Sequence, residues 1–159
     1  MLIKLLTLFF LFSAPVLDGG SKSYEKLYDD AGNITAEGWK MGEMRVKYWK
    51  FYHPNGQVAS KGHYEKNRKN EYWYYYNPEG KIIKEGHYDK GTAENWWIFY
   101  DLATREKRKV QFKNGLRNGF CLVYKNGSLK QVERYKNDKK NGVWNDVTSF
   151  KRDNPDVSF

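Results

Sequence analysis

The sequence predicts an all-β protein in which repeated antiparallel β-hairpins form one twisted meander sheet. The first observation is a 24-residue period, which five tyrosines keep from Tyr28 to Tyr124. The second is a recurring turn sequence, Asn-Pro-Glu-Gly at 77–80 and His-Pro-Asn-Gly at 53–56. The third is that the flanking segments are aromatic and β-branched, as strands are, and that none has a sustained helical period. A period of this length indicates stacked structural units, so we expect about ten short strands.

The N-terminal segment 1–21 differs from the rest of the chain. Lys4 is followed by the largely apolar residues 5–17, which is the pattern of a secretory signal peptide. The apolar run is too short for a membrane span, which needs about 20 residues. We therefore expect export to the periplasm, the cell envelope or the extracellular space. The alternative is an uncleaved hydrophobic N-terminus that tethers the protein to a membrane.

Three further segments follow the N-terminal one. Residues 22–27 form a short lead-in, residues 28–144 form a repeat domain of about five units, and residues 145–159 form a C-terminal tail or cap. In the fifth unit the turn shortens to Lys-Asn-Gly at 125–127, so the phase slips by one residue. Trp144 then arrives one position early in the tryptophan column.

The turns explain why each unit reads as a hairpin. Proline at the second turn position has a fixed φ that suits a type I turn, and glycine supplies the left-handed residue that follows. The connection between one hairpin and the next is longer, polar and rich in Gly, Asn and Lys, as at 113–119.

Alternation of side chains along each strand assigns a core to one side of the sheet, here called the tryptophan face. We expect its glycines to leave room for a tryptophan ring to lie across the neighbouring backbone. The same alternation places Val58 and Ile82 on this face. The predicted structural core comprises Trp49, Trp73, Trp97, Phe51, Phe99, Gly62 and Gly86. Stacking of sugars or lipids on the tryptophans is the alternative interpretation.

The opposite side of the sheet is predicted to be an amphipathic surface, here called the tyrosine face. Tyrosine is favoured both in strands and at protein interfaces, so this column either holds the hairpins together or binds a partner. The candidate binding residues are Tyr52, Tyr76, Tyr100, Tyr124, Tyr72 and Trp96.

The repeated pattern resembles the MORN-repeat-variant family, whose members are often labelled YwqK-type antitoxin components. Tryptophan, tyrosine three residues later, a turn glycine and a Gly-x-Tyr segment carry the resemblance, most clearly at 73–91 and 124–144. The fourth unit departs from it, with Val110 in place of glycine and Cys121 in place of tryptophan. The resemblance implies a hairpin-repeat sheet that binds a protein or a lipid head group without catalysis, and the label implies a toxin partner.

Enzymatic chemistry is not indicated. The chain has one cysteine and three histidines, and it contains no phosphate-binding glycine loop, nucleophile elbow or zinc-protease motif. His63 and His87 occupy equivalent positions, but two ligands do not make a zinc site. Cys121 stands in a core column, so we expect it to be buried. The sequence predicts no cofactor, no metal site and no catalytic residue.

The formal charge of +9 is concentrated in the connections between hairpins. Stacked repeats would align these charges into a basic stripe, which either attracts an anionic lipid or envelope polymer or only keeps the protein soluble. Nucleic acid is an unlikely partner for an exported protein. The stripe comprises Lys66, Arg68, Lys69, Lys113, Arg117, Lys136, Lys139 and Lys140.

Three functions therefore remain open. The first is an exported interaction module that binds a protein or an anionic envelope surface. The second is an antitoxin or immunity protein; because the chain is basic, its toxin would be acidic or neutral. The third is a carbohydrate-binding module, which would need exposed tryptophan rings.

Overall fold

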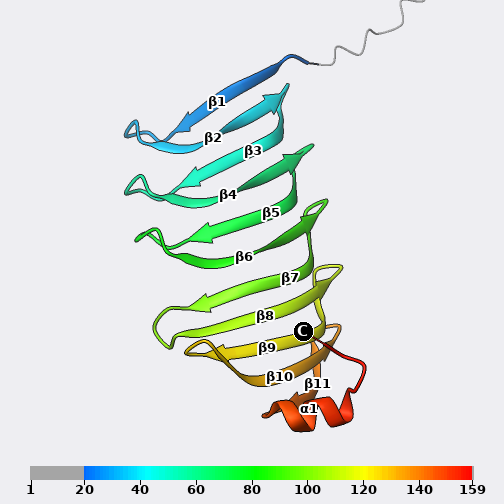
Figure 1. The fold of residues 1–159 in the computed structure, drawn as a ribbon. Helices are drawn as coiled ribbons and strands as arrows, with labels where there is room; N and C mark the ends of the chain where they lie inside the picture. Colours follow the sequence, from blue (N-terminus) through cyan, green and yellow to red (C-terminus); the bar gives the residue numbers. More distant parts are fainter. Residues whose placement is uncertain (1–19, 159) are drawn as a thin grey trace, which may run out of the picture.

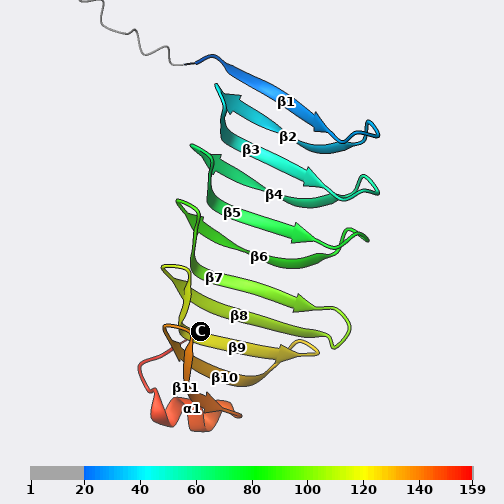
Figure 2. The same ribbon diagram turned by 180° about the vertical axis from the view of Figure 1, so that it is seen from behind.

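The computed structural model describes residues 20–158, which form one open antiparallel sheet and one short helix. The spatial order of the strands is their order in the sequence, from β1 at one edge to β11 at the other (Figures 1 and 2). The elements are β1 (Lys22–Tyr28), β2 (Ile34–Met41), β3 (Met44–Tyr52), β4 (Val58–Glu65), β5 (Arg68–Tyr76), β6 (Ile82–Asp89), β7 (Thr92–Asp101), β8 (Glu106–Lys113), β9 (Leu116–Lys125), β10 (Ser128–Lys136), β11 (Lys139–Trp144) and α1 (Val147–Asp153).

The predicted fold class is confirmed, with eleven strands where about ten were expected. The segment 22–27, predicted to be a lead-in, belongs to strand β1 together with Tyr28. In this strand Glu25 stands in the tryptophan position of the repeat. It pairs with Gly38, and its carboxylate lies 3.2 Å from the Lys40 ammonium. A charged residue on an edge strand disfavours pairing with another chain.

Residues 1–19, which include most of the predicted signal segment, lie outside the described residues.

The tight turns have the predicted hydrogen bonds. The Gly80 N–H donates to the Asn77 carbonyl at 2.9 Å, and Gly80 has a φ of 75°.

Val58 and Ile82 lie on the tyrosine face, so the prediction that they lie on the tryptophan face was wrong. A bulge after the turn places Val58 directly opposite Tyr52, and another places Ile82 opposite a tyrosine of the tyrosine face. Directly paired residues share a face, so the bulge changes the alternation that the sequence implied.

The tryptophan rings lie flat on glycines of the preceding strand. A Cβ atom added to Gly38, Gly62 or Gly86 would lie 2.2–2.4 Å from the ring of the tryptophan on the next strand. Trp49 and Trp73 are completely buried, and Trp97 is 4% exposed. Phe51 and Phe99 contact these rings, with centroids 6.1 and 6.2 Å from Trp49 and Trp97.

A bulge beside each tryptophan supplies a partner for its indole N–H. Gly38 pairs with Trp49, but the next residue, Trp39, pairs with Val46, so two residues of β3 have no partner on β2. Lys47, one of these two, has a φ of 55°, and Glu71 and Asn95 repeat this left-handed conformation at the same period.

The bulge frees one carbonyl per repeat from strand pairing. The Trp49 N–H donates to the Trp39 carbonyl at 2.8 Å, and the equivalent bonds of Trp73 and Trp97 each measure 3.0 Å. Each ring thus fills the space above a glycine and satisfies a backbone acceptor of the same strand.

In the fourth unit, both the glycine and the tryptophan of this arrangement are replaced. Val110 stands where the glycine belongs and is directly opposite Cys121, which stands where the tryptophan belongs. The larger aliphatic side chain and the smaller thiol share one space, and both are buried. With no indole present, the side-chain oxygen of Gln111 spans the bulge and accepts the Phe120 N–H at 2.7 Å.

The C-terminal end is closed by α1 on the tyrosine face. The one-residue slip pairs Trp144 with Val132, so its ring lies on the face opposite to Trp49, Trp73 and Trp97. There it contacts Phe150 of α1, with ring centroids 5.4 Å apart. The Asp146 carboxylate caps the helix by accepting the Ser149 N–H at 2.7 Å.

The pairing of a ring with a glycine predicts strong coupling between Gly62 and Trp73. Trp73→Ala should cost about 3–5 kcal/mol, because it leaves a cavity in the core. Gly62→Val should cost about 2 kcal/mol, because its side chain collides with the ring. The double variant Gly62→Val, Trp73→Cys copies the natural pair of the fourth unit. Its loss in free energy of unfolding, measured in urea, should be about 1–3 kcal/mol smaller than the summed losses of the single variants Gly62→Val and Trp73→Cys.

A matched control combines Gly62→Val with Val143→Ala, a distant and exposed site. That pair should be additive. Additivity of the Gly62 and Trp73 variants to within about 0.5 kcal/mol would contradict the proposed packing.

Candidate binding surfaces

On the tyrosine face, the phenolic hydroxyls of the predicted column are partly occupied by charged neighbours. The Tyr52 hydroxyl donates to Glu37 at 2.5 Å, and the Tyr100 hydroxyl donates to Glu85 at 2.6 Å. Burial and these carboxylates raise the pKa of both tyrosines, so both remain protonated donors. These contacts hold neighbouring hairpins together, which was one of the two roles expected for the column.

The middle of the tyrosine face is aromatic and accessible. Tyr72 is 36% exposed and lies 5.1 Å from Tyr74 and 6.3 Å from His87, measured between ring centroids. Burial, followed by the charge of Glu85, raises the pKa of Tyr72 to about 12. The Lys61 ammonium lies over the rings of Tyr74 and Tyr76, at 5.5 and 5.3 Å from their centroids.

Two members of the predicted binding face are partly buried by the C-terminal segment. Trp96 and Tyr124 pack against the cluster of Leu122, Val132 and Phe150, which forms beneath α1. The accessible part of the face is therefore narrower than the sequence predicts, and it ends where the C-terminal segment begins. A hollow at this boundary is lined by Trp96, Lys109, Gln111, Phe120, Leu122, Val157 and Ser158.

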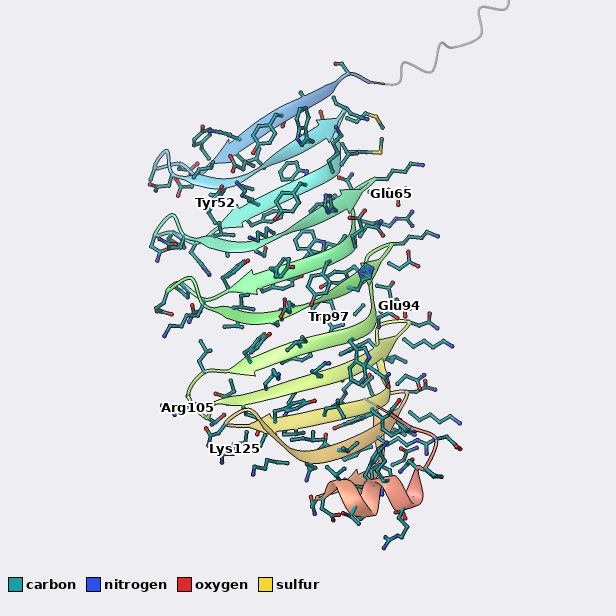
Figure 3. All side chains as sticks on the ribbon, viewed as in Figure 1. Tyr52, Glu65, Glu94, Trp97, Arg105 and Lys125 are labelled. Carbon is teal, nitrogen blue, oxygen red and sulfur yellow. The ribbon has the colours of Figure 1, made fainter. Side chains whose placement is uncertain are left out.

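The connections between hairpins all lie along one side of the sheet where strands end, here called the connection edge. The charges on this edge are mixed. Figure 3 shows Glu65 on this edge, whereas Tyr52, Arg105 and Lys125 lie on the opposite edge. Five members of the predicted stripe are exposed there, namely Lys66, Arg68, Lys113, Lys136 and Lys139. Exposed acids stand in or directly beside the same connections, namely Glu43, Glu65, Asp89 and Asp138. The edge is thus not a continuous basic stripe.

Lys69, Arg117 and Lys140 are at a different place from the one predicted. Their cationic groups lie over rings of the tryptophan face, where Lys69 is 4.4 Å from Trp73 and Arg117 is 4.4 Å from Tyr135. All three belong to strands, namely β5, β9 and β11. Arg45, which was not among the predicted site residues, lies one period before Lys69, and its guanidinium is 4.9 Å from the centroid of the Trp49 ring. Arg45 and Lys69 are one 24-residue period apart and Arg117 follows two periods later, a spacing that could have revealed this column.

A buried carboxylate lies on the tryptophan face of the last hairpin. Glu133 is 2% exposed and accepts hydrogen bonds from Tyr135 and Lys140, while the Arg108 guanidinium lies 3.6 Å away. Burial opposes ionisation, but hydrogen bonds from Lys140 and Tyr135 and the two cations outweigh it and lower the pKa of Glu133.

The same surroundings have the opposite effect on the neighbouring thiol. Burial and the Glu133 charge raise the pKa of Cys121 to about 11. At neutral pH the cysteine is therefore a protonated, inert thiol, which agrees with its place in the core.

The predicted histidines do not converge. The His63 Nδ1 atom lies 3.0 Å from Glu71, and the buried His87 Nδ1 atom has no hydrogen-bond partner. Within residues 20–158, no group of three or more His, Cys, Asp or Glu side chains could hold a metal ion. In the same part of the chain, no helix is long and apolar enough to cross a membrane.

Two segments of the chain, residues 45–66 and 72–90, match the family model described as MORN repeat variant. The first match covers the hairpin of β3 with β4, and the second covers the end of β5 together with β6. Of the three pairs of a tryptophan ring and the glycine beneath it, the matches include both members of Gly62–Trp73. MORN repeats are generally binding modules, not catalysts. No curated protein matches the chain.

The lowered pKa of Glu133 makes stability depend on pH. A carboxyl whose pKa is lower in the folded state stabilises the fold above its unfolded pKa, and this contribution is lost as the pH falls through the folded pKa. Glu133→Gln should cost about 1–2 kcal/mol at pH 7, a value reduced because Lys140 and Arg108 are partly exposed.

Between pH 7 and about pH 3, wild type should therefore lose more stability than Glu133→Gln, measured by urea midpoints. Glu79→Gln, in an exposed turn, serves as the control and should leave the pH dependence unchanged. If the stability of wild type and of Glu133→Gln depended equally on pH, ionisation of the Glu133 carboxylate would not contribute to the stability of the fold.

Proposed function

We propose that this chain is an exported, non-enzymatic module that binds a protein through the accessible part of its tyrosine face. One observation carries the proposal. At its C-terminal end the same face is covered by the chain's own helix, whose Phe150 is 1% exposed and contacts the rings of Phe120 and Trp144. The uncovered continuation carries the same kind of side chains, centred on Tyr72 and Tyr74.

The physical properties of this surface suit protein recognition. Tyrosines offer a large contact area with few rotatable bonds, and here the strands on which they stand are held by a packed core, so little entropy is lost on binding. Aromatic residues are also enriched where interfaces are tightest. The expected partner is a segment that resembles α1, with an aromatic side chain as its anchor.

The other open functions have weaker support. Sugar stacking on the tryptophan column needs exposed rings, whereas Trp49, Trp73 and Trp97 are buried. A basic edge for an anionic envelope surface is interrupted by acids such as Glu65 and Asp89. A toxin would be one kind of protein partner for the proposed surface, and the net charge of +9 favours an acidic or neutral one.

The proposal is tested by comparing proteins captured by three versions of the purified chain. The double variant Tyr72→Ala, Tyr74→Ala removes the centre of the surface. Tyr28→Ala removes a tyrosine that is 59% exposed on the edge strand and serves as the matched control. A protein retained by wild type and by Tyr28→Ala should be bound at least about tenfold more weakly by the double variant, because buried interface tyrosines often contribute 2 kcal/mol or more.

Thermal melts establish that the double variant is folded. Equal capture by all three versions would refute binding through this face. A second arm uses anionic and neutral lipid vesicles with the triple variant Lys66→Glu, Arg68→Glu, Lys113→Glu, which alters only exposed residues at or beside the connections. If binding to anionic vesicles is strong, salt-sensitive and lost in this variant, the edge is the binding surface instead.

A further inference from the structure

Two lysines flank one tyrosine on the tryptophan face. The Lys69 ammonium lies 5.0 Å and the Lys84 ammonium 4.4 Å from the centroid of the Tyr75 ring. Lys69 also donates a hydrogen bond to the Tyr75 hydroxyl at 2.9 Å, and that hydroxyl lies 2.9 Å from the hydroxyl of Tyr88. Two ammonium groups and two hydroxyls therefore gather around one ring.

Neither lysine has an acidic partner in the described part of the chain, because none of its ion pairs includes them. The equivalent positions in later repeats provide a comparison. Arg108, one repeat after Lys84, pairs with Glu106 at 2.6 Å. Arg117, two repeats after Lys69, pairs with Asp138 at 2.9 Å. The later repeats neutralise their cations on this face, whereas this repeat does not.

Structural roles account for only part of the arrangement. A cation over an aromatic ring is attracted by the negative face of the ring, which explains why one ammonium lies there. The second ammonium beside the same ring is repelled by the first. Burial and the Lys84 charge lower the pKa of Lys69, so the pair carries an electrostatic cost that no acidic side chain among the described residues offsets.

We propose that Lys69 and Lys84, together with the hydroxyls of Tyr75 and Tyr88, form a binding site for an oxyanion of the phosphate or sulfate type. Such a group accepts several hydrogen bonds and neutralises both ammonium charges. Burial and the hydrogen bond to Tyr88 raise the pKa of Tyr75, so its hydroxyl keeps a proton to donate. The site lies on the face opposite to the proposed protein-binding surface, so each proposal can fail without the other.

Inorganic phosphate is the probe, titrated into the purified protein at constant ionic strength set with chloride. NMR follows the ε-methylene resonances of the lysines. Phosphate should shift the signals of Lys69 and Lys84 saturably and should raise the pKa of Lys69, since an anion stabilises its charged form. Lys84→Gln should weaken binding at least about tenfold, because hydrogen bonds between charged groups are the strong ones.

Lys81→Gln is the matched control, because it removes the same charge from an exposed turn nearby. It should change phosphate affinity by less than about twofold, and thermal melts should show both variants equally folded. Absence of saturable shifts at Lys69 and Lys84, or equal weakening by Lys84→Gln and Lys81→Gln, would overturn the proposal.

The source of the oxyanion is separated by two further arms. Glycerol phosphate tests a soluble ester, and vesicles that contain a phosphomonoester lipid test a membrane head group. The site is supported when either arm shows binding that Lys84→Gln weakens and Lys81→Gln does not. If Lys84→Gln weakens binding in neither arm, or weakens it no more than Lys81→Gln does, the proposal is contradicted.

Discussion

A tryptophan ring can lie flat on a β-sheet only where the strand beneath it has no side chain at that point. Gly38, Gly62 and Gly86 provide these positions, and a Cβ atom on any of them would lie 2.2–2.4 Å from the ring above. The ring in turn covers the backbone that glycine leaves bare. Because each ring stands on one strand and covers the strand before it, the contact joins consecutive strands, and the sheet needs no second layer to bury its core.

This constraint determines what each face can offer. On the tryptophan face, the aromatic layer is covered by the long side chains of Arg45 and Lys69, whose cationic groups lie over the rings. On the tyrosine face, smaller contacts between tyrosines and charged residues hold the hairpins together and leave aromatic surface accessible around Tyr72. A sheet with two chemically different faces is suited to binding.

The sequence predicted those features that residue type alone carries. The period, the hairpins and the glycines beneath the tryptophans follow from amino acids with few alternatives at these positions. The bulges could not be predicted, because Lys47 and Glu71 have no preference for a positive φ, and tertiary packing imposes it. Lys69 was assigned to a connection because the end of a strand is poorly marked in sequence. Trp144 changed face because a slip of one residue reverses every side chain that follows.

The central claim is that indole rings and the carbonyls freed by the bulges join one strand to the next. Hydrogen exchange of the indole N–H protons, measured by NMR under native conditions, tests it most directly. The account predicts that Trp49, Trp73 and Trp97 exchange only through extensive unfolding, as slowly as the backbone amides of the central strands. Trp39, outside this set, should exchange much faster. Fast exchange at Trp73, flanked by intact repeats on both sides, would contradict the account.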